Sequence, residues 1–90
     1  MTQNNSEDTV EVKREYYESG ILWFETPYVN GKEHGTEKIY YKSGALQCET
    51  PYVEGKIHGI GKIYNRENSN IDCLTLYNKD RILLSHSRES

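Results

Sequence analysis

Long apolar stretches are missing from this 90-residue sequence, and none approaches the roughly 20 residues that a membrane-spanning helix needs. The opening segment, Met-Thr-Gln-Asn-Asn-Ser, lacks the charged and apolar regions of a signal peptide. Nowhere do apolar residues recur with the period of an α-helix over a useful length. These absences lead us to expect a soluble, cytoplasmic protein without helices.

A basic stripe is missing as well. The 11 Lys and Arg residues and the 14 Asp and Glu residues are mixed along the chain, and the formal net charge is −3. A protein that follows a phosphate backbone needs its basic residues gathered on one surface. We therefore expect no direct binding to nucleic acid.

The sequence contains no recognisable catalytic or metal-binding arrangement. Ser19, Ser43 and Ser69 fall in turns, and no Ser/His/Asp set of sensible spacing surrounds them. His34 and His58 have no carboxylate or thiol nearby at the spacing of metal ligands, so a structural role in turns is the stronger interpretation. We expect no catalytic residue, no metal and no cofactor, and so no enzyme.

What the sequence does have is an internal repeat. Residues 16–39 and 40–63 match at 16 of 24 positions without a gap. A third, degenerate copy covers residues 64–82, with one residue inserted within 66–70. A period of this length is typical of stacked supersecondary units, none of which can bury its apolar face alone.

A single domain holds these copies. The repeat pattern begins near Val10, so residues 10–85 are predicted to form one β-repeat domain. Residues 1–9 are predicted to be a disordered N-terminal tail and residues 86–90 a C-terminal tail, because both segments are polar and free of apolar pattern.

Side chains alternate with period two between turn residues, which predicts β-strands. Asn30-Gly31 favours a type I′ hairpin turn, because both central positions of that turn need positive φ, and Glu54-Gly55 is a weaker version. The predicted fold is all-β: an antiparallel meander of about seven strands built from β-hairpin repeats. The expected strands are residues 10–17, 21–29, 36–41, 45–53, 60–65, 71–77 and 82–85.

The repeat also assigns two faces to the predicted sheet. A structural face is expected to carry one column of matched residues, namely Leu22, Phe24, Thr26 and Tyr28, then Leu46, Cys48, Thr50 and Tyr52, then Ile71, Cys73, Thr75 and Tyr77. The opposite face varies between copies, as recognition surfaces do in repeat proteins. A face that is merely solvated would vary in the same way.

The two cysteines belong to that structural column. One strand is expected between Cys48 and Cys73, which separates them by about two strand spacings, roughly 9.6 Å. A disulfide needs Cα atoms within ~7 Å of each other. Both are therefore expected to be buried free thiols beside Phe24, which is consistent with a reducing cytoplasm.

On the variable face we predict a protein-binding site formed by Trp23, Glu25, Gln47 and Glu49. Trp is enriched where partners dock, and the two acids suit a partner with a basic surface. The alternatives are that Trp23 caps the open end of the stack and that the acids are simply solvated.

Two motifs carry a resemblance to a known family. Tyr-Tyr-x-Ser-Gly is followed by Gly-Lys-x-His-Gly at residues 31–35 and again at residues 55–59, a pattern that resembles the MORN repeat. The segment Glu-Thr-Pro-Tyr-Val-x-Gly-Lys is similar to the bacterial MORN-variant proteins that are often described as antitoxin-like. The resemblance implies a β-hairpin array without catalytic residues or cofactor. The third copy lacks Gly-Lys-x-His-Gly, which favours a capping role for it.

These observations favour a non-enzymatic module that binds another protein and neutralises or occludes it, as an antitoxin or a phage-type inhibitor of a defence protein would. The alternative is a lipid- or membrane-associated scaffold module. A homodimer is also expected, because an open sheet leaves its Leu/Phe/Cys/Tyr face uncovered. Strong curling of the sheet onto itself is the competing solution.

Overall fold

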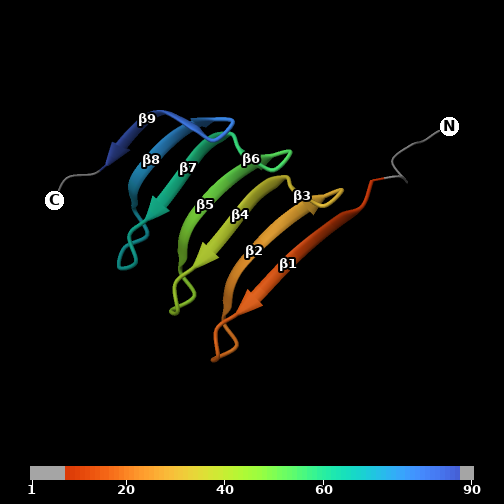
Figure 1. The fold of residues 1–90 in the computed structure, drawn as a ribbon. Coiled ribbons are helices and arrows are strands. Elements are labelled where there is room, and N and C mark those ends of the chain that lie inside the picture. The colour runs from red at the N-terminus through yellow and green to blue at the C-terminus, as the bar shows by residue number, and fades with distance from the viewer. Residues whose placement is uncertain (1–7, 88–90) are drawn as a thin grey trace.

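A computed structural model describes residues 8–87 and shows a single antiparallel sheet without helices (Figure 1). Its strands are β1 (Val10–Tyr16), β2 (Leu22–Val29), β3 (Lys32–Glu33), β4 (Gly35–Tyr40), β5 (Leu46–Val53), β6 (Lys56–Ile57), β7 (Gly59–Tyr64), β8 (Ile71–Asn78) and β9 (Arg81–Ser87). The predicted all-β meander is confirmed. The seven predicted strands correspond to the seven long ones.

The long strands follow one another in chain order across the sheet, β1-β2-β4-β5-β7-β8-β9. The two-residue strands β3 and β6 pair back onto β2 and β5. β1 and β9 form the two edges, so the sheet stays open and does not close on itself. In Figure 1 the long strands arch side by side, with the Ser-Gly turns at one end and the short hairpins at the other.

Type I′ geometry recurs at all three hairpin tips. Asn30 and Gly31 have φ values of 53° and 83°, and Glu54 and Gly55 have values of 52° and 84°, which confirms the two predicted turns. At the third tip, Lys79 and Asp80 adopt φ values of 51° and 75° although neither is Gly or Asn. The third copy therefore keeps the backbone of the first two while carrying residues that strain it.

The register creates regular rows on one face, which we call the Thr face. Two rows cross all seven long strands: Glu15, Phe24, Ile39, Cys48, Ile63, Cys73 and Ser87; and Lys13, Thr26, Glu37, Thr50, Gly61, Thr75 and Ser85. Nearer the hairpin tips, Tyr28 pairs with Glu11 and Glu33, Tyr52 with Gly35 and Ile57, and Tyr77 with Gly59 and Ile82. We call the opposite face the Pro face, since it carries Pro27 and Pro51.

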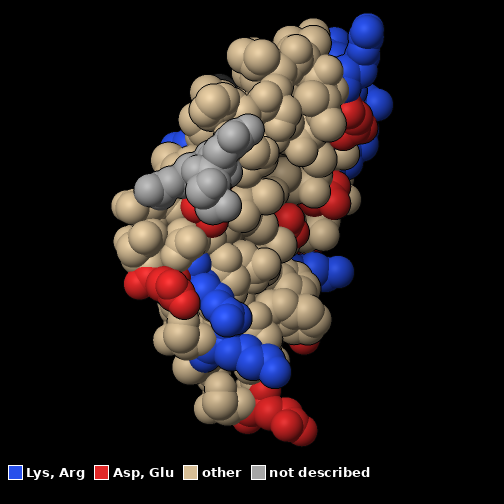
Figure 2. All heavy atoms as spheres, turned by 90° about the vertical axis from the view of Figure 1, so that its left-hand side faces the viewer, with Lys and Arg blue, Asp and Glu red and all other residues tan. Residues whose placement is uncertain are grey.

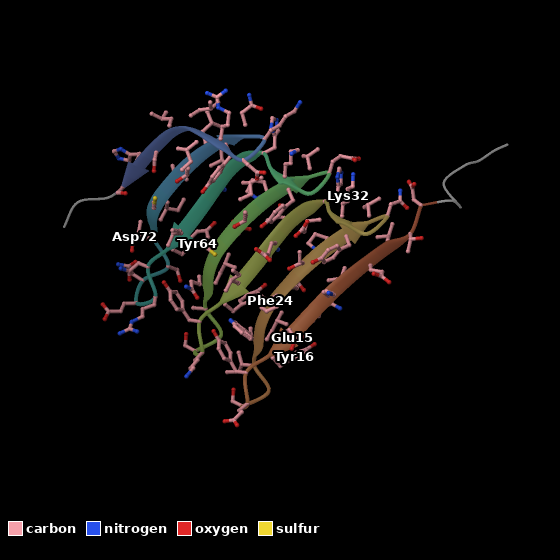
Figure 3. All side chains as sticks on the ribbon, viewed as in Figure 1. Glu15, Tyr16, Phe24, Lys32, Tyr64 and Asp72 are labelled. Atoms are coloured by element: carbon pink, nitrogen blue, oxygen red, sulfur yellow. The ribbon has the colours of Figure 1, made fainter. Side chains whose placement is uncertain are left out.

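A β-bulge at the start of β2 changes the predicted assignment of faces. Phe24 pairs with Glu15 and Leu22 with Tyr16, so Trp23 is the extra residue of the bulge. The rings of Trp23 and Phe24 lie 5.1 Å apart, which places both side chains on the Thr face. The prediction that Trp23 lies opposite Phe24 is wrong, because the bulge breaks the period-two alternation. Figure 3 labels Glu15, Tyr16 and Phe24 at this shift.

The same bulge recurs once in each copy, with Gln47 and Asp72 as the extra residues. Beyond each bulge the alternation is inverted, so Leu22, Leu46 and Ile71 pair with the tyrosines Tyr16, Tyr40 and Tyr64. Tyr64 donates a hydrogen bond to Glu49 on the Pro face. The three aliphatic residues therefore lie on the Pro face and not in the predicted column with Phe24.

The sheet has almost no interior. Among residues 8–87 no hydrophobic side chain is fully buried, whereas Thr26 is only 3% exposed. The Thr26 hydroxyl donates to the Glu37 carboxylate at 2.8 Å, which satisfies a polar group at the most enclosed point of the Thr face. Stability must therefore come from strand pairing and half-buried side chains, not from a closed core.

Tyrosine hydroxyls tie each repeat to the next. Tyr17 donates to the backbone oxygen of Tyr40, and Tyr41 donates to that of Tyr64, both at 2.6 Å. At the matched place in the third copy stands Asn65, whose side-chain oxygen caps its own turn by accepting from the amides of residues 67 and 68. The series of ties ends where the repeats end.

The cysteines and the chain ends complete the fold. Cys48 and Cys73 are free, as predicted, with β7 between their strands, but both are half-buried and not buried, because none of the described segments covers the Thr face. Of the predicted tails, residues 1–7 and 88–90 lie outside the described residues. Thr9 exchanges two hydrogen bonds with Asn30, and residues 86 and 87 belong to β9.

Candidate protein-binding surface

The structure divides the four predicted binding residues between the two faces. Trp23 lies on the Thr face, and Gln47 is the extra residue of the matched bulge in the second copy. Glu25 and Glu49 remain on the Pro face. A single site that contains all four residues is therefore not formed.

Trp23 belongs to a small aromatic cluster beside the first Ser-Gly turn. Its ring stacks on Tyr17 at 5.8 Å and meets the edge of Phe24 at 5.1 Å. The side chain is held on both sides and is still 44% exposed. Next to it, a hollow of about 470 Å³ lies between the turns and is lined in part by Tyr17, Tyr41 and Lys42.

Glu25 and Glu49 belong to a row of alternating charge across the Pro face. The register runs Arg14, Glu25, Lys38, Glu49, Lys62, and then Leu74 and His86. Arg14 Nε donates to Glu25 at 3.1 Å, and the Tyr64 hydroxyl donates to Glu49 at 2.5 Å. Because bases flank both acids, the acids do not form a free negative patch.

The hydrogen bond from Tyr64 has an electrostatic consequence. It stabilises the neutral phenol beside an ionised carboxylate, and burial acts in the same direction, so the pKa of Tyr64 rises to about 12. On the Thr face, burial together with Glu37 raises the pKa of the Cys48 thiol. Hydrogen bonds from Ser87 and Thr75 lower the pKa of Cys73.

A group of exposed aliphatic residues on the Pro face was missed by the sequence analysis. Ile60, Leu76 and Leu84 are neighbours in register across β7, β8 and β9, and Leu74 lies one row away. We call these four residues the aliphatic cluster. Their exposed fractions run from 36% for Leu74 to 66% for Leu84. With His86 and Thr75 they line a hollow of about 210 Å³.

The aliphatic cluster arises from two changes in the third copy. Leu74 stands where the first two copies have Glu25 and Glu49, and Leu76 stands where they have Pro27 and Pro51. Both changes are visible in the sequence, but the capping role predicted for the third copy rested on its missing Gly-Lys-x-His-Gly and took no account of them. Only the register shows that β9 adds Leu84 alongside these leucines.

The edge strand β9 extends this apolar region. All seven of its residues are exposed, and Ile82, Leu83 and Leu84 are 63%, 55% and 66% exposed. Figure 2 looks onto this side of the molecule and shows a broad surface without charged side chains over its upper part. Charged groups gather along one margin and toward the lower end.

His34 contributes to the packing of the hairpin tips. His34 Nδ1 accepts a hydrogen bond from the backbone amide of Glu54 at 3.3 Å, which links two hairpin tips and gives His34 a structural role. Within residues 8–87 no three His, Cys, Asp or Glu side chains are grouped so that they could hold a metal ion. The same part of the chain has no helix long and apolar enough to span a membrane.

Comparison with known proteins identifies the repeat. Residues 12–30 and 33–54 match the MORN repeat variant family. Each segment covers one strand, a Ser-Gly turn and the following strand, that is, the β1–β2 and β4–β5 units. Neither a curated protein nor a solved structure matches the chain significantly. Through these two segments, the chain is similar to the MORN repeat variant family.

Proposed function

We propose that this protein is a non-enzymatic module that binds another protein through its Pro face, with the aliphatic cluster at the centre of the interface. MORN repeats are generally binding modules and not enzymes. The observation that carries the proposal is the exposure of Ile60, Leu74, Leu76 and Leu84 on one face. Contiguous exposed apolar side chains on a soluble protein commonly mark an interaction site.

The surroundings of the aliphatic cluster have the arrangement expected of an interface. Lys62 borders it in register, and the charged row continues through Glu49 and Lys38. An apolar centre with a polar rim is the usual anatomy of a protein interface. We infer that Glu25 and Glu49 act as rim contacts. The partner should then present an apolar group with mixed charges around it, and not simply a basic surface.

The finer function that we propose is occlusion of the partner, as performed by an antitoxin or by a phage-type inhibitor of a defence protein. A broad open sheet can cover a functional surface without performing chemistry. The described residues offer a broad exposed face of the kind that such occlusion requires.

The test is affinity purification of the tagged chain from its native host, followed by mass spectrometry, with Leu74→Glu as the decisive variant. The new carboxylate reproduces Glu25 and Glu49 of the other copies and lies beside Lys62, so the fold should persist. We expect Leu74→Glu to weaken partner binding at least ~10-fold, about 1.4 kcal/mol.

The matched control is Trp23→Ala, which removes the exposed aromatic group on the other face. It should leave partner binding within about twofold of the original value. The proposal fails if Leu74→Glu, with its β-type circular dichroism intact, captures the same proteins at the same affinity. If Trp23→Ala alone abolishes capture, the binding surface is the Thr face.

A membrane-associated scaffold is the second candidate, and one observation favours it. Lys62 borders the aliphatic cluster, and Arg81 belongs to the same exposed edge strand as Leu84. Apolar residues bordered by bases can bind an anionic membrane surface. Flotation with vesicles of anionic phospholipid tests this. Co-flotation of the original chain that Leu74→Glu abolishes would support the membrane-associated scaffold. If the original chain does not float with the vesicles, binding to a partner protein remains the proposed function.

A further inference from the structure

We propose that β9 is a self-association edge, through which a second copy of this chain pairs antiparallel to the first, β9 against β9, and continues the sheet across a two-fold axis. The inference is independent of the proposed function. It rests on the edge of β9 with which no described strand pairs, on the absence of charged residues from Ile82 to Ser87, and on the residues that the pairing would bring together.

The two edges of the sheet differ in how they are protected. Four of the seven residues of β1 are charged, namely Glu11, Lys13, Arg14 and Glu15. β9 carries one charged residue, Arg81, at its beginning. Charged side chains, Lys above all, are the usual device that keeps an edge strand from pairing, whereas an uncharged edge invites it. Only β1 has that protection.

A bulge limits which part of β9 can pair. Leu76 is opposite Leu84 and Tyr77 is opposite Ile82, so Leu83 is the extra residue, and the strand is regular from Leu84 to Ser87. An antiparallel pairing centred on Ser85 uses this regular stretch. It sets Ser85 against Ser85 of the second copy and Leu84 against His86.

That register is complementary on both faces. On the Thr face, Thr75 and Ser85 already share a hydrogen bond at 3.2 Å, and a second Ser85 would continue the hydroxyl row. On the Pro face, His86 is the partner of Leu74, so a Leu84 placed against it joins the two aliphatic clusters into one apolar band. No like charges meet in this register.

The expected affinity is modest. One short strand pairing buries less than the ~1,600 Å² of a standard interface, so we expect a dissociation constant in about the micromolar range. The dimer leaves both Pro faces on the same side of the sheet and exposed. Partner binding therefore does not compete with it.

The mass of the complete chain, measured by light scattering at a series of concentrations, tests the proposal. We expect a monomer that becomes a dimer of about twice the 10.5 kDa chain mass, with no larger species. Ser85→Lys places like charges opposite each other and should raise the dissociation constant at least ~10-fold. Val12→Lys, on β1, should leave it unchanged. Both variants should keep the β-type circular dichroism.

A crosslink fixes the register. In a Cys73→Ser background, which removes the thiol 4.0 Å from Ser85, the variant Ser85→Cys should form an intermolecular disulfide on oxidation. Lys13→Cys, at the other end of the same row, should not. The proposal is overturned by a monomer at all concentrations, by growth beyond a dimer, by dissociation through Val12→Lys, or by crosslinking through Lys13→Cys. Loss of the dimer in Ser85→Lys with unchanged partner capture would separate this result from the proposed function.

Discussion

At the position where the first two repeats have Glu25 and Glu49, the third copy has Leu74, and the backbone at all three positions is a paired strand of the same sheet. In the first two repeats the acid accepts a hydrogen bond, from Arg14 or from Tyr64. In the third copy the leucine lines an apolar hollow. The array can therefore change its surface chemistry without changing its fold.

The turns at the Ser-Gly end of the sheet also keep their backbone shape when the sequence changes. Gly20 and Gly44 take φ values of 98° and 97°, and the matched residue of the third copy, Ser69, takes 64°. Positive φ strains a residue that has a Cβ. Ser69 is held there because its amide donates to the backbone oxygen of Asn65 at 2.9 Å, within a turn that the Asn65 side chain also caps. The third copy keeps the shape of the repeat at a cost in local strain.

The largest expected effect comes from Gly59, the first residue of β7. Gly59 has a φ of 119°, and a Cβ there would lie 3.2 Å from Pro51 Cγ. Gly59→Val should lower the free energy of unfolding by about 3 kcal/mol, from backbone strain and overpacking together. Urea unfolding followed by circular dichroism measures it.

The control is Ile82→Val, because Ile82 lies at the same hairpin end of the sheet, where it pairs with Tyr77 as Ile57 pairs with Tyr52. Its side chain is exposed, so the change should stay within about 0.5 kcal/mol. Equal losses for the two variants would mean that position 59 does not require glycine in the way described.

A pair of reciprocal substitutions gives an intermediate effect. Ser69→Gly should raise the free energy of unfolding by about 0.5 to 1 kcal/mol, because glycine adopts positive φ without steric cost, while Gly44→Ser should lower it by about 1 kcal/mol. Both are measured by thermal and urea unfolding. If both changes destabilise by the same amount, the third copy is adapted to Ser69 and is not strained.

The smallest expected effect is a change of the free energy of unfolding with pH, caused by the hydrogen bond from Tyr64 to Glu49. The pKa of Tyr64 is about 12 in the folded chain, against about 10 when unfolded, so its contribution to stability is complete below pH 10 and is lost as the pH rises from 10 to 12. Solvent screening should keep it below about 1 kcal/mol. Tyr64→Phe should flatten the stability profile in that range, and Tyr40→Phe should not. An unchanged profile for Tyr64→Phe would show that the hydrogen bond to Glu49 contributes nothing in solution.

Alternation and turn chemistry were sufficient to predict the order of the strands. Both signals are local: Asn30 and Gly31 suit a type I′ turn whatever surrounds them, and the 24-residue repeat locates its second occurrence. The two-residue strands β3 and β6 were not predicted, because two residues carry no periodic signal.

The prediction of which side chains share a face of the sheet was wrong at the β-bulges. A bulge depends on the register between two strands, and period-two alternation along one strand cannot show it. Trp23 and Leu22 were therefore placed on the wrong sides, whereas Glu25 and Glu49, beyond the bulge, were placed correctly. The aliphatic cluster was missed for a related reason, since Leu84 joins Leu74 and Leu76 only through the pairing of β8 with β9.

The most direct test of the proposed binding surface is a nuclear magnetic resonance titration of the labelled chain with the partner that it captures. The four aliphatic side chains of the cluster carry methyl groups on the Pro face, and the indole N–H of Trp23, the only Trp in the chain, reports on the Thr face. We predict that the methyl signals of Ile60, Leu74, Leu76 and Leu84 shift or broaden while the indole signal stays in place. A shifted indole signal with unchanged methyl signals would contradict the account.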